Sequence, residues 1–513
     1  MSWVIFIAIS TAPLYAQPED LTSKVHRGKD LMAAGRFEEA IPIYRDVVQA
    51  LPNNSGPVLN LGLALHMAGH EQEAVTQFQS VLKLDPGNLP ARLFLGAAYL
   101  RLKASAEAVE PLRTVVRAQP DNREARLYLG QALLSLDRFQ EASEQFGRLS
   151  ELDPKNPKVW NGLGLSYEGL AGRNFEGLEK VAPESAYSLV LLADDHLAAD
   201  QYRSAFFFYR ESLAKMPEMR GVHAMLSEIY RRDGHADWAA KEVEKERKLP
   251  PLHCDGAGGV WNASSVLSRG NRNGSPQELE CNFWAGRYQE VAALSKDSKT
   301  AEAYFWRTRA YSELARQAFS RLAQLPPSAE VHEMMAQMQF NRKNYDEATK
   351  EWQEALKLAP GNPYYLQGLA ISLSCNGKYE GARQLLEDLI KQSPDSAELN
   401  YWLGFTLFSL EKVEAAIPFL EKGVEEDPTV LPAQRDLARA YLQVGQIDKA
   451  IPHLKAALPI DEQGSLYWQL ARAYGKSGQI ELQKEMLERF QQIKNSVTAE
   501  KRKFEEQKEI TPP

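Results

Sequence analysis

Prolines recur in this chain at intervals of 34 residues, and other residue types recur with them. The prolines fall into three series, namely Pro52, Pro86, Pro120 and Pro154, then Pro217 and Pro251, and then Pro360, Pro394 and Pro428. Before eight of them the same residues return: a glycine or alanine 24 residues earlier, an alanine 12 residues earlier and a bulky residue eight residues earlier. A fixed period of this length indicates stacked copies of one supersecondary unit.

Within one unit, apolar residues follow the spacing of an amphipathic helix twice. In the segment 57–84 one apolar stripe precedes Gly69, which supplies a turn, and a second stripe follows it. The cluster Asp85–Asn88 ends the second helix, because proline cannot continue a helix. Small residues such as Gly62 and Ala74 allow the two helix backbones to approach each other. One such hairpin cannot bury its apolar face alone, so consecutive units must stack.

This pattern resembles the tetratricopeptide repeat. Unit 397–430 shows the signature positions of that family well, at Leu403, Gly404, Leu407, Ala416, Leu420 and Pro428. Eight units are in register: 21–54, 55–88, 89–122, 123–156, 329–362, 363–396, 397–430 and 431–464. Units 186–219 and 220–253 keep the spacing with weaker residues, and 464–497 gives a last hairpin. The resemblance implies an all-α fold, a right-handed superhelical solenoid of antiparallel helix pairs with a concave binding groove.

Two departures from the repeat divide the chain. Unit 157–185 is five residues short and has Glu176 in place of its alanine. Residues 254–276 are rich in Gly, Ser and Asn, so we expect a loop there or a divide between two halves of the array. The expected domains are a signal peptide (1–16), an N-terminal array (21–253), the loop (254–276), degenerate helical repeats (277–328), a C-terminal array (329–498) and a charged tail that frays (499–513).

Charge and motifs argue against several classes of function. The net charge is −8 and acids and bases are interspersed, so we expect no binding of nucleic acid. The nine histidines are scattered without the spacing of metal ligands. We expect no catalytic site, no metal and no cofactor, and predict a non-catalytic scaffold that binds partner proteins or peptides. The alternative from another class is an enzyme with its activity in the repeat-breaking segment 252–328.

The first sixteen residues resemble a secretory signal peptide. An apolar run over residues 4–9 is followed by Ala16 and by a polar stretch from Gln17. The run is too short to span a membrane, and no other segment approaches that length. We expect an exported bacterial protein in the periplasm or outside the cell. Since no Lys or Arg precedes the run, a cytoplasmic adaptor stays the alternative.

Three cysteines allow one disulfide. Cys254 and Cys281 flank the Gly-rich loop 27 residues apart, and a bond between them would restrain that loop. The bond requires Cα atoms within about 7 Å of each other. Cys375 lies in a helical apolar stripe and is expected to be a buried free thiol. In a reducing compartment all three thiols would stay free.

The family resemblance also implies which residues face the groove. In tetratricopeptide repeats the groove is lined by the first helix of each unit, chiefly at its second, fifth, ninth, twelfth and thirteenth positions. The N-terminal groove is then apolar and includes Leu59, Leu63, Leu93 and Leu127. In the C-terminal array these positions are aromatic and basic, with Tyr401, Phe405, Phe408, Arg435, Arg439, Trp468 and Arg472. We expect these residues to form one strip for a peptide with apolar and acidic residues, unless the two phenylalanines only pack between hairpins.

Overall fold

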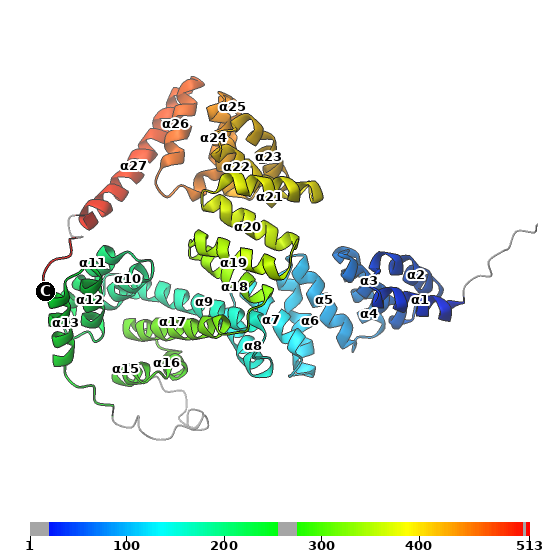
Figure 1. Cartoon of the computed structure of the whole chain (residues 1–513), viewed down its shortest axis with the longest axis horizontal. Coiled ribbons are helices and arrows are strands. Elements are labelled where there is room, and N and C mark those ends of the chain that lie inside the picture. Colours follow the sequence, from blue (N-terminus) through cyan, green and yellow to red (C-terminus); the bar gives the residue numbers. More distant parts are fainter. Residues whose placement is uncertain (1–19, 255–273, 506–508) are drawn as a thin grey trace, which may run out of the picture. The chain divides into compact units, whose positions relative to one another are not determined.

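The computed structural model describes residues 20–254, 274–505 and 509–513. In these ranges the regular elements are α-helices and one short 3₁₀ helix, and no strand occurs among them. The expected signal peptide and most of the Gly-rich loop lie outside the described residues. The chain forms two compact units, 1–166 and 167–513. Each of them is described on its own below (Figure 1).

The first unit contains four helical hairpins and the start of a ninth helix. The hairpins are α1 (Leu21–Ala33) with α2 (Phe37–Ala50), α3 (Ser55–Ala68) with α4 (Glu71–Leu84), α5 (Leu89–Arg101) with α6 (Ser105–Ala118), and α7 (Arg123–Ser135) with α8 (Phe139–Leu152). Helix α9 (Pro157–Val181) runs from this unit into the second one. Each helix packs against the next one along the chain, as the repeat predicts.

The second unit begins with two hairpins, α10 (Ala186–Ala198) with α11 (Tyr202–Lys215) and α12 (Val222–Arg232) with α13 (Ala236–Lys248). Then follow α15 (Pro276–Trp284), α16 (Tyr288–Ser295) and the long α17 (Ala301–Ala323). The regular array resumes with α18 (Ala329–Asn341), α19 (Tyr345–Leu358), α20 (Pro363–Cys375), α21 (Tyr379–Gln392), α22 (Ala397–Ser409), α23 (Val413–Glu426), α24 (Leu431–Gln443) and α25 (Ile447–Ala457). The 3₁₀ helix Leu458–Ile460, α26 (Ser465–Lys476) and α27 (Ile480–Glu505) complete it.

The last residue of the proline cluster caps the first helix of the following unit. Asn54, Asn88 and Asn122 precede α3, α5 and α7, and each side chain accepts a hydrogen bond from a backbone N–H in the first turn of its helix. Such an N-cap satisfies a donor that the helix itself leaves unpaired. The cluster therefore both ends one unit and begins the next one.

The turn inside each hairpin needs one residue with positive φ. Most of these residues recur at the 34-residue period of the repeat, and the set comprises Gly35, Gly69, Lys103, Asp137, Asp200, Gly234, Gly286, Lys343, Gly377, Glu411, Gly445 and Gly478. Five of them are not glycine and still adopt the left-handed conformation. The geometry of the turn is therefore fixed by the packing of the two helices and not by glycine alone.

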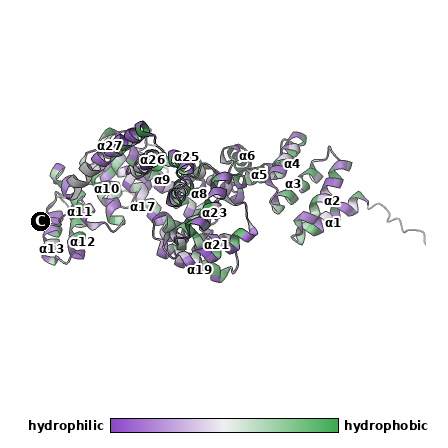
Figure 2. Ribbon diagram, turned by 90° about the horizontal axis from the view of Figure 1, so that it is seen from above, coloured by the Kyte–Doolittle hydropathy of each residue, from purple (hydrophilic) through white to green (hydrophobic). Residues whose placement is uncertain are grey.

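The alanines of the repeat are the most buried positions of the hairpins. Ala40, Ala74, Ala142 and Ala416 each expose 0% of their surface. The bulky residue that follows four positions later is buried as well, for example Phe78 at 0%. Figure 2 shows the result along the ribbons, where hydrophobic and hydrophilic residues alternate around the turns of individual helices. The sequence pattern therefore marks the contacts between helices.

Residues 157–185 do not form a shortened hairpin. They form the single 25-residue helix α9 and the start of the connection to α10. The segment lacks a turn residue of the kind seen in the other hairpins, since no positive-φ residue occurs within it. Because this segment lacks both the turn residue and the alanine of the repeat, it forms one unbroken helix.

The out-of-register segment 277–328 is part of the second unit and is not a separate domain. Phe283 and Phe305, from α15 and α17, share one buried apolar cluster with Val190, Tyr209 and Leu226 from the preceding hairpins. Most apolar residues of α15, α16 and α17 are thus used in the core. Among the described helices, none is long and apolar enough to cross a membrane.

Ala416 offers a test of the assigned register. We expect Ala416→Trp to lower the free energy of unfolding by about 1–3 kcal/mol or more, because the larger side chain has no space between α22 and α23. The neighbouring Ala415 is exposed on the same helix, so Ala415→Trp is the matched control and should have little effect. Thermal and urea unfolding followed by circular dichroism would measure both variants. Equal losses would contradict the register.

Candidate functional site

The first helices of the C-terminal array carry an aromatic cavity. Ser328, Asn362 and Ser396 cap α18, α20 and α22, so the three helices begin at equivalent positions of their units. A cavity of about 380 Å³ lies over them. Its lining residues are Gln337, Phe340, Asn341, Trp352, Tyr364, Gln367, Gly368, Ile371, Ser372, Glu398 and Trp402. We call this the aromatic cavity.

Trp352 comes from the second helix α19 and reaches the cavity because Gly368 leaves room for it. A Cβ atom at Gly368 would lie 2.4 Å from the Trp352 ring. Tyr364 meets the same indole edge to face, with ring centroids 6.0 Å apart. Trp352 is almost fully buried, whereas Tyr364 exposes 51% of its surface. The cavity therefore has an anchored aromatic residue and an accessible one.

Polar groups line the same cavity. Gln337 donates a hydrogen bond to the Tyr364 hydroxyl at 2.7 Å, and Gln367 donates one to Glu398 at 2.8 Å. Partial burial raises the pKa of Tyr364. The buried Ser372 hydroxyl has no hydrogen-bond partner among the described residues. The cavity thus combines apolar rings with polar atoms that can orient a ligand.

Trp402 connects the aromatic cavity to the predicted aromatic strip. Its ring lies 5.0 Å from Tyr401 and 5.6 Å from Phe405, and these last two rings are 6.3 Å apart. All three side chains are partly exposed. The structure therefore brings the predicted Tyr401 and Phe405 together, and it adds Trp402 to them.

A buried carboxylate organises the two arginines of α24. Asp436 exposes 0% of its surface and accepts hydrogen bonds from Arg435 Nε at 2.9 Å and from Arg439 Nη1 at 3.3 Å. The Tyr401 hydroxyl donates a longer bond of 3.5 Å to the same group. Burial and the charge of Asp436 raise the pKa of Tyr401, which keeps it a donor. Arg439 also lies over the Phe408 ring, at 5.1 Å from its centroid.

Asp436 and the aromatic cavity were not among the predicted site residues. The same groove positions, applied to units 329–362 and 363–396, select Gln337, Phe340, Tyr364, Gln367 and Ile371. The predicted strip begins at unit 397–430 and therefore does not include these residues. Asp436 faces inward beside a groove position, and its role becomes visible only through its contacts with side chains on two helices.

The remaining predicted groove residues lie elsewhere. Trp468 and Arg472 pair with each other on α26, with the guanidinium 4.7 Å from the ring centroid. In the first unit Leu93 is buried, and Leu59 and Leu63 are half-buried against the apolar cluster of α1 to α5. Leu127 is also half-buried. These leucines contribute to packing, so they offer less open surface than the C-terminal residues.

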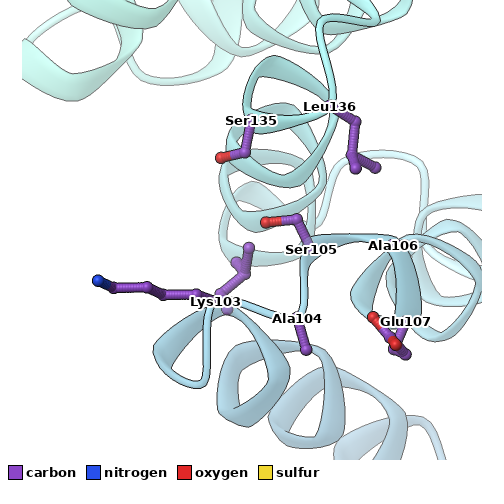
Figure 3. Close-up of a pocket in the computed structure, with 8 residues that line it drawn as sticks. Lys103, Ala104, Ser105, Ala106, Glu107, Ser135 and Leu136 are labelled. Atoms are coloured by element: carbon purple, nitrogen blue, oxygen red, sulfur yellow. The ribbon is translucent and has the colours of Figure 1, made fainter. Parts of the chain in front are cut away.

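The first unit holds a cavity of another kind. It measures about 490 Å³ and lies between the α5–α6 turn and the end of α7. Figure 3 shows Lys103, Ser105 and Ser135 extending toward the same side, with Ala104 and Ala106 beside them. Its lining contains no aromatic side chain. It therefore offers less contact area to a peptide than the aromatic cavity does.

Two of the cysteines are bonded to each other. Cys254 and Cys281 form a disulfide with Cα atoms 5.7 Å apart, which ties the residues after α13 to α15. Cys375 is free and half-buried, and burial raises its pKa to about 11. No group of His, Cys, Asp and Glu side chains in the described ranges is arranged to hold a metal ion.

Comparison with known proteins gives one consistent match. Sequence models described as tetratricopeptide repeats match residues 26–88, 65–121, 106–165, 329–362, 376–429, 407–474 and 464–496, which together span more than half of the chain. No curated protein matches the sequence.

Several solved structures are also similar. A MamA fragment from Desulfovibrio magneticus RS-1 is 22% identical, with 33% of this chain and 96% of that one covered and a TM-score of 0.30. A tetratricopeptide repeat protein from Parabacteroides merdae is 12% identical, with 69% and 98% covered and a TM-score of 0.31.

The cluster around Asp436 can be tested without a ligand. We expect Asp436→Asn to lower the free energy of unfolding by about 1 kcal/mol or more, because hydrogen bonds to a charged acceptor are lost in a buried place. The exposed Asp448 on α25 provides the matched control Asp448→Asn, which should have little effect. Urea unfolding would compare the two. Wild-type stability of Asp436→Asn would show that the carboxylate does not hold the arginines.

Proposed function

Since the chain belongs to the tetratricopeptide-repeat family, we propose that it is a protein-interaction scaffold whose C-terminal array captures a peptide segment of a partner protein. The observation that carries this proposal is the continuity of the aromatic cavity with Tyr401, Phe405 and the arginines around Asp436. Except for Trp352 on α19, the side chains of this surface lie on successive first helices, α18, α20, α22 and α24. We call this surface the C-terminal groove.

The chemistry of the C-terminal groove defines the peptide that suits it. The rings of Tyr364 and Trp402 give a large contact area and have few side-chain torsions to immobilise, so they suit an apolar side chain of the partner. Arg439 can bind a carboxylate with two parallel hydrogen bonds. Asp436 already holds the guanidinium groups in place, which reduces the entropy lost on binding. We therefore propose a partner segment with apolar and acidic residues.

We propose no catalytic role for the chain. The alternative to a scaffold is an enzyme with its active site in residues 252–328. In the described part of that segment, the helices α15, α16 and α17 supply apolar residues to the core of the second unit. Because these residues are used for packing, we favour the scaffold over the enzyme.

Charge reversal at Arg439 tests the proposal. The partner would first be identified with the full chain by affinity capture from native cells, and its affinity then measured with purified proteins. We expect Arg439→Glu to weaken binding about tenfold or more, as for other residues that dominate an interface. Tyr364→Ala should weaken it as well, through the loss of contact area.

Arg489→Glu is the matched control, because Arg489 is exposed on α27, outside the C-terminal groove. It makes the same charge change and should bind normally. Normal binding by both Arg439→Glu and Tyr364→Ala would contradict the proposed groove. Circular dichroism and melting would verify that the variants stay folded.

We also propose that the protein is exported from a bacterial cell, with a cytoplasmic adaptor as the alternative. The apolar run before Gln17 supports export. The disulfide between Cys254 and Cys281 also suits an oxidising compartment. We expect the mature protein to begin near Gln17, and non-reducing peptide mapping to recover the two cysteines linked. Protein in the cytosol that retains Met1 would rule out export.

A further inference from the structure

The last described residues of the chain lie against helices far from them in sequence. Glu509–Pro513 contacts α11 and α12, and the end of the chain is drawn beside these helices in Figure 1. The Tyr230 hydroxyl donates a hydrogen bond to the Thr511 carbonyl oxygen at 2.7 Å, and Arg210 Nη1 donates a longer one of 3.5 Å to the Pro512 carbonyl. These five residues therefore do not fray as the charged composition of the tail predicted.

An apolar side chain anchors the same segment. Ile510 is half-buried and packs against the apolar cluster that the hairpins α10–α13 share with α15–α17. The flanking Glu509 and Thr511 are exposed. The contact thus uses one apolar side chain and two backbone carbonyl groups, and it needs no charged side chain of the segment.

The receiving surface is aromatic. The Tyr230 ring is buried and meets Phe206 and Trp238 edge to face, with centroids 5.5 and 5.6 Å away. Trp238 is in turn stacked by His235. The Arg210 guanidinium lies 5.8 Å from the centroid of the Phe206 ring. Burial raises the pKa of Tyr230, and its hydroxyl is the donor to the Thr511 carbonyl oxygen.

The bound segment is suited to such a surface. Proline fixes its own φ angle and confines the preceding residue to extended conformations, so Thr511–Pro513 is held extended before it binds. Extended proline-rich peptides bind grooves lined by aromatic residues with a small loss of conformational entropy. Every peptide carries backbone carbonyl groups. Other peptides of the same shape can therefore accept the same hydrogen bonds.

We propose that Phe206, Arg210, Tyr230 and Trp238 form a second peptide-binding site, which accepts extended segments with an apolar residue, one further residue and two prolines. The chain's own Ile510–Pro513 occupies this site in cis. The site is separate from the C-terminal groove and does not depend on the function proposed for it. A partner segment of the same kind must displace the tethered one, so the tail competes with external ligands.

Because Ile510–Pro513 is attached to the same chain, a small number of contacts is enough to hold it in the site. A segment attached to the same chain binds at the effective concentration that its linker allows, which exceeds the concentration of most free peptides. Occupancy in cis lowers the apparent affinity of an external peptide by the fraction of sites that remain open. Weakening the tethered copy should therefore reveal the site to a free one.

A peptide-binding measurement on the full chain tests this proposal. The probe is a fluorescein-labelled peptide with the sequence of residues 506–513, and its anisotropy reports binding. Ile510→Asp in the full chain removes the apolar anchor of the tethered copy and leaves the receiving surface intact. We expect the probe to bind this variant about tenfold or more tightly than the wild-type chain. A probe peptide carrying the same Ile-to-Asp change should not bind.

Substitutions in the receiving surface identify the site. In the Ile510→Asp background, Tyr230→Phe removes only the hydroxyl donor and should weaken the probe by about two- to tenfold. Tyr441→Phe on α24 is the matched control, because this buried tyrosine also loses a hydrogen bond, to Glu421, but lies outside the proposed site. Arg210→Ala changes an exposed residue and serves as the second variant if Tyr230→Phe melts early.

Four results would overturn the proposal. The probe could fail to bind the Ile510→Asp chain, or bind it no more tightly than the wild-type chain. It could also bind equally after Tyr230→Phe and Arg210→Ala. Finally, light scattering could show that the wild-type chain is a dimer and the Ile510→Asp chain a monomer, in which case the tail binds a second copy.

Discussion

The structure depends on one repeated contact, in which a bulky side chain of the second helix lies against a residue without a large side chain on the first. A Cβ atom at Gly62 would lie 2.7 Å from Phe78, and one at Gly404 would lie 2.6 Å from Leu420. Both distances are shorter than atoms tolerate, so the backbones approach as closely as glycine permits. Because this contact fixes how the two helices cross, it also fixes which side chains are left facing outward from the first helix.

The same contact accounts for the aromatic cavity. In unit 329–362 the small residue of the first helix is Ala336, and the bulky residue is Trp352. The space for its ring is supplied by Gly368 in the following unit. The indole consequently reaches across two units and lines the cavity between them. A glycine in the following unit thus allows a bulky core side chain to line the proposed binding surface as well.

The fold could be predicted from the sequence because its determinants are local and periodic. Proline, alanine and the bulky residue each act within one hairpin, so a period of 34 residues suffices to place them. The aromatic and basic residues of α22 and α24 could be predicted because the resemblance to the family implies which positions of each first helix face the groove. Asp436 could not, since the repeat does not show that its carboxylate is buried, and the docking of the last residues could not, since Tyr230 and Thr511 are 281 residues apart. The unbroken α9 was missed because the repeat describes hairpins, and the absence of a turn residue has no signature of its own.

The two sides of each first helix have different roles, which explains how one fold can carry different binding surfaces. The side that faces the second helix is restricted to small residues, whereas the groove side is restricted only by its ligand. Tyr364 is therefore expected to change with little effect on stability, because it exposes 51% of its surface. Trp352 is the exception, since it is at once the bulky core residue of its unit and a wall of the cavity. Its replacement would disturb packing and binding together, so only the exposed residues of the C-terminal groove can separate recognition from folding.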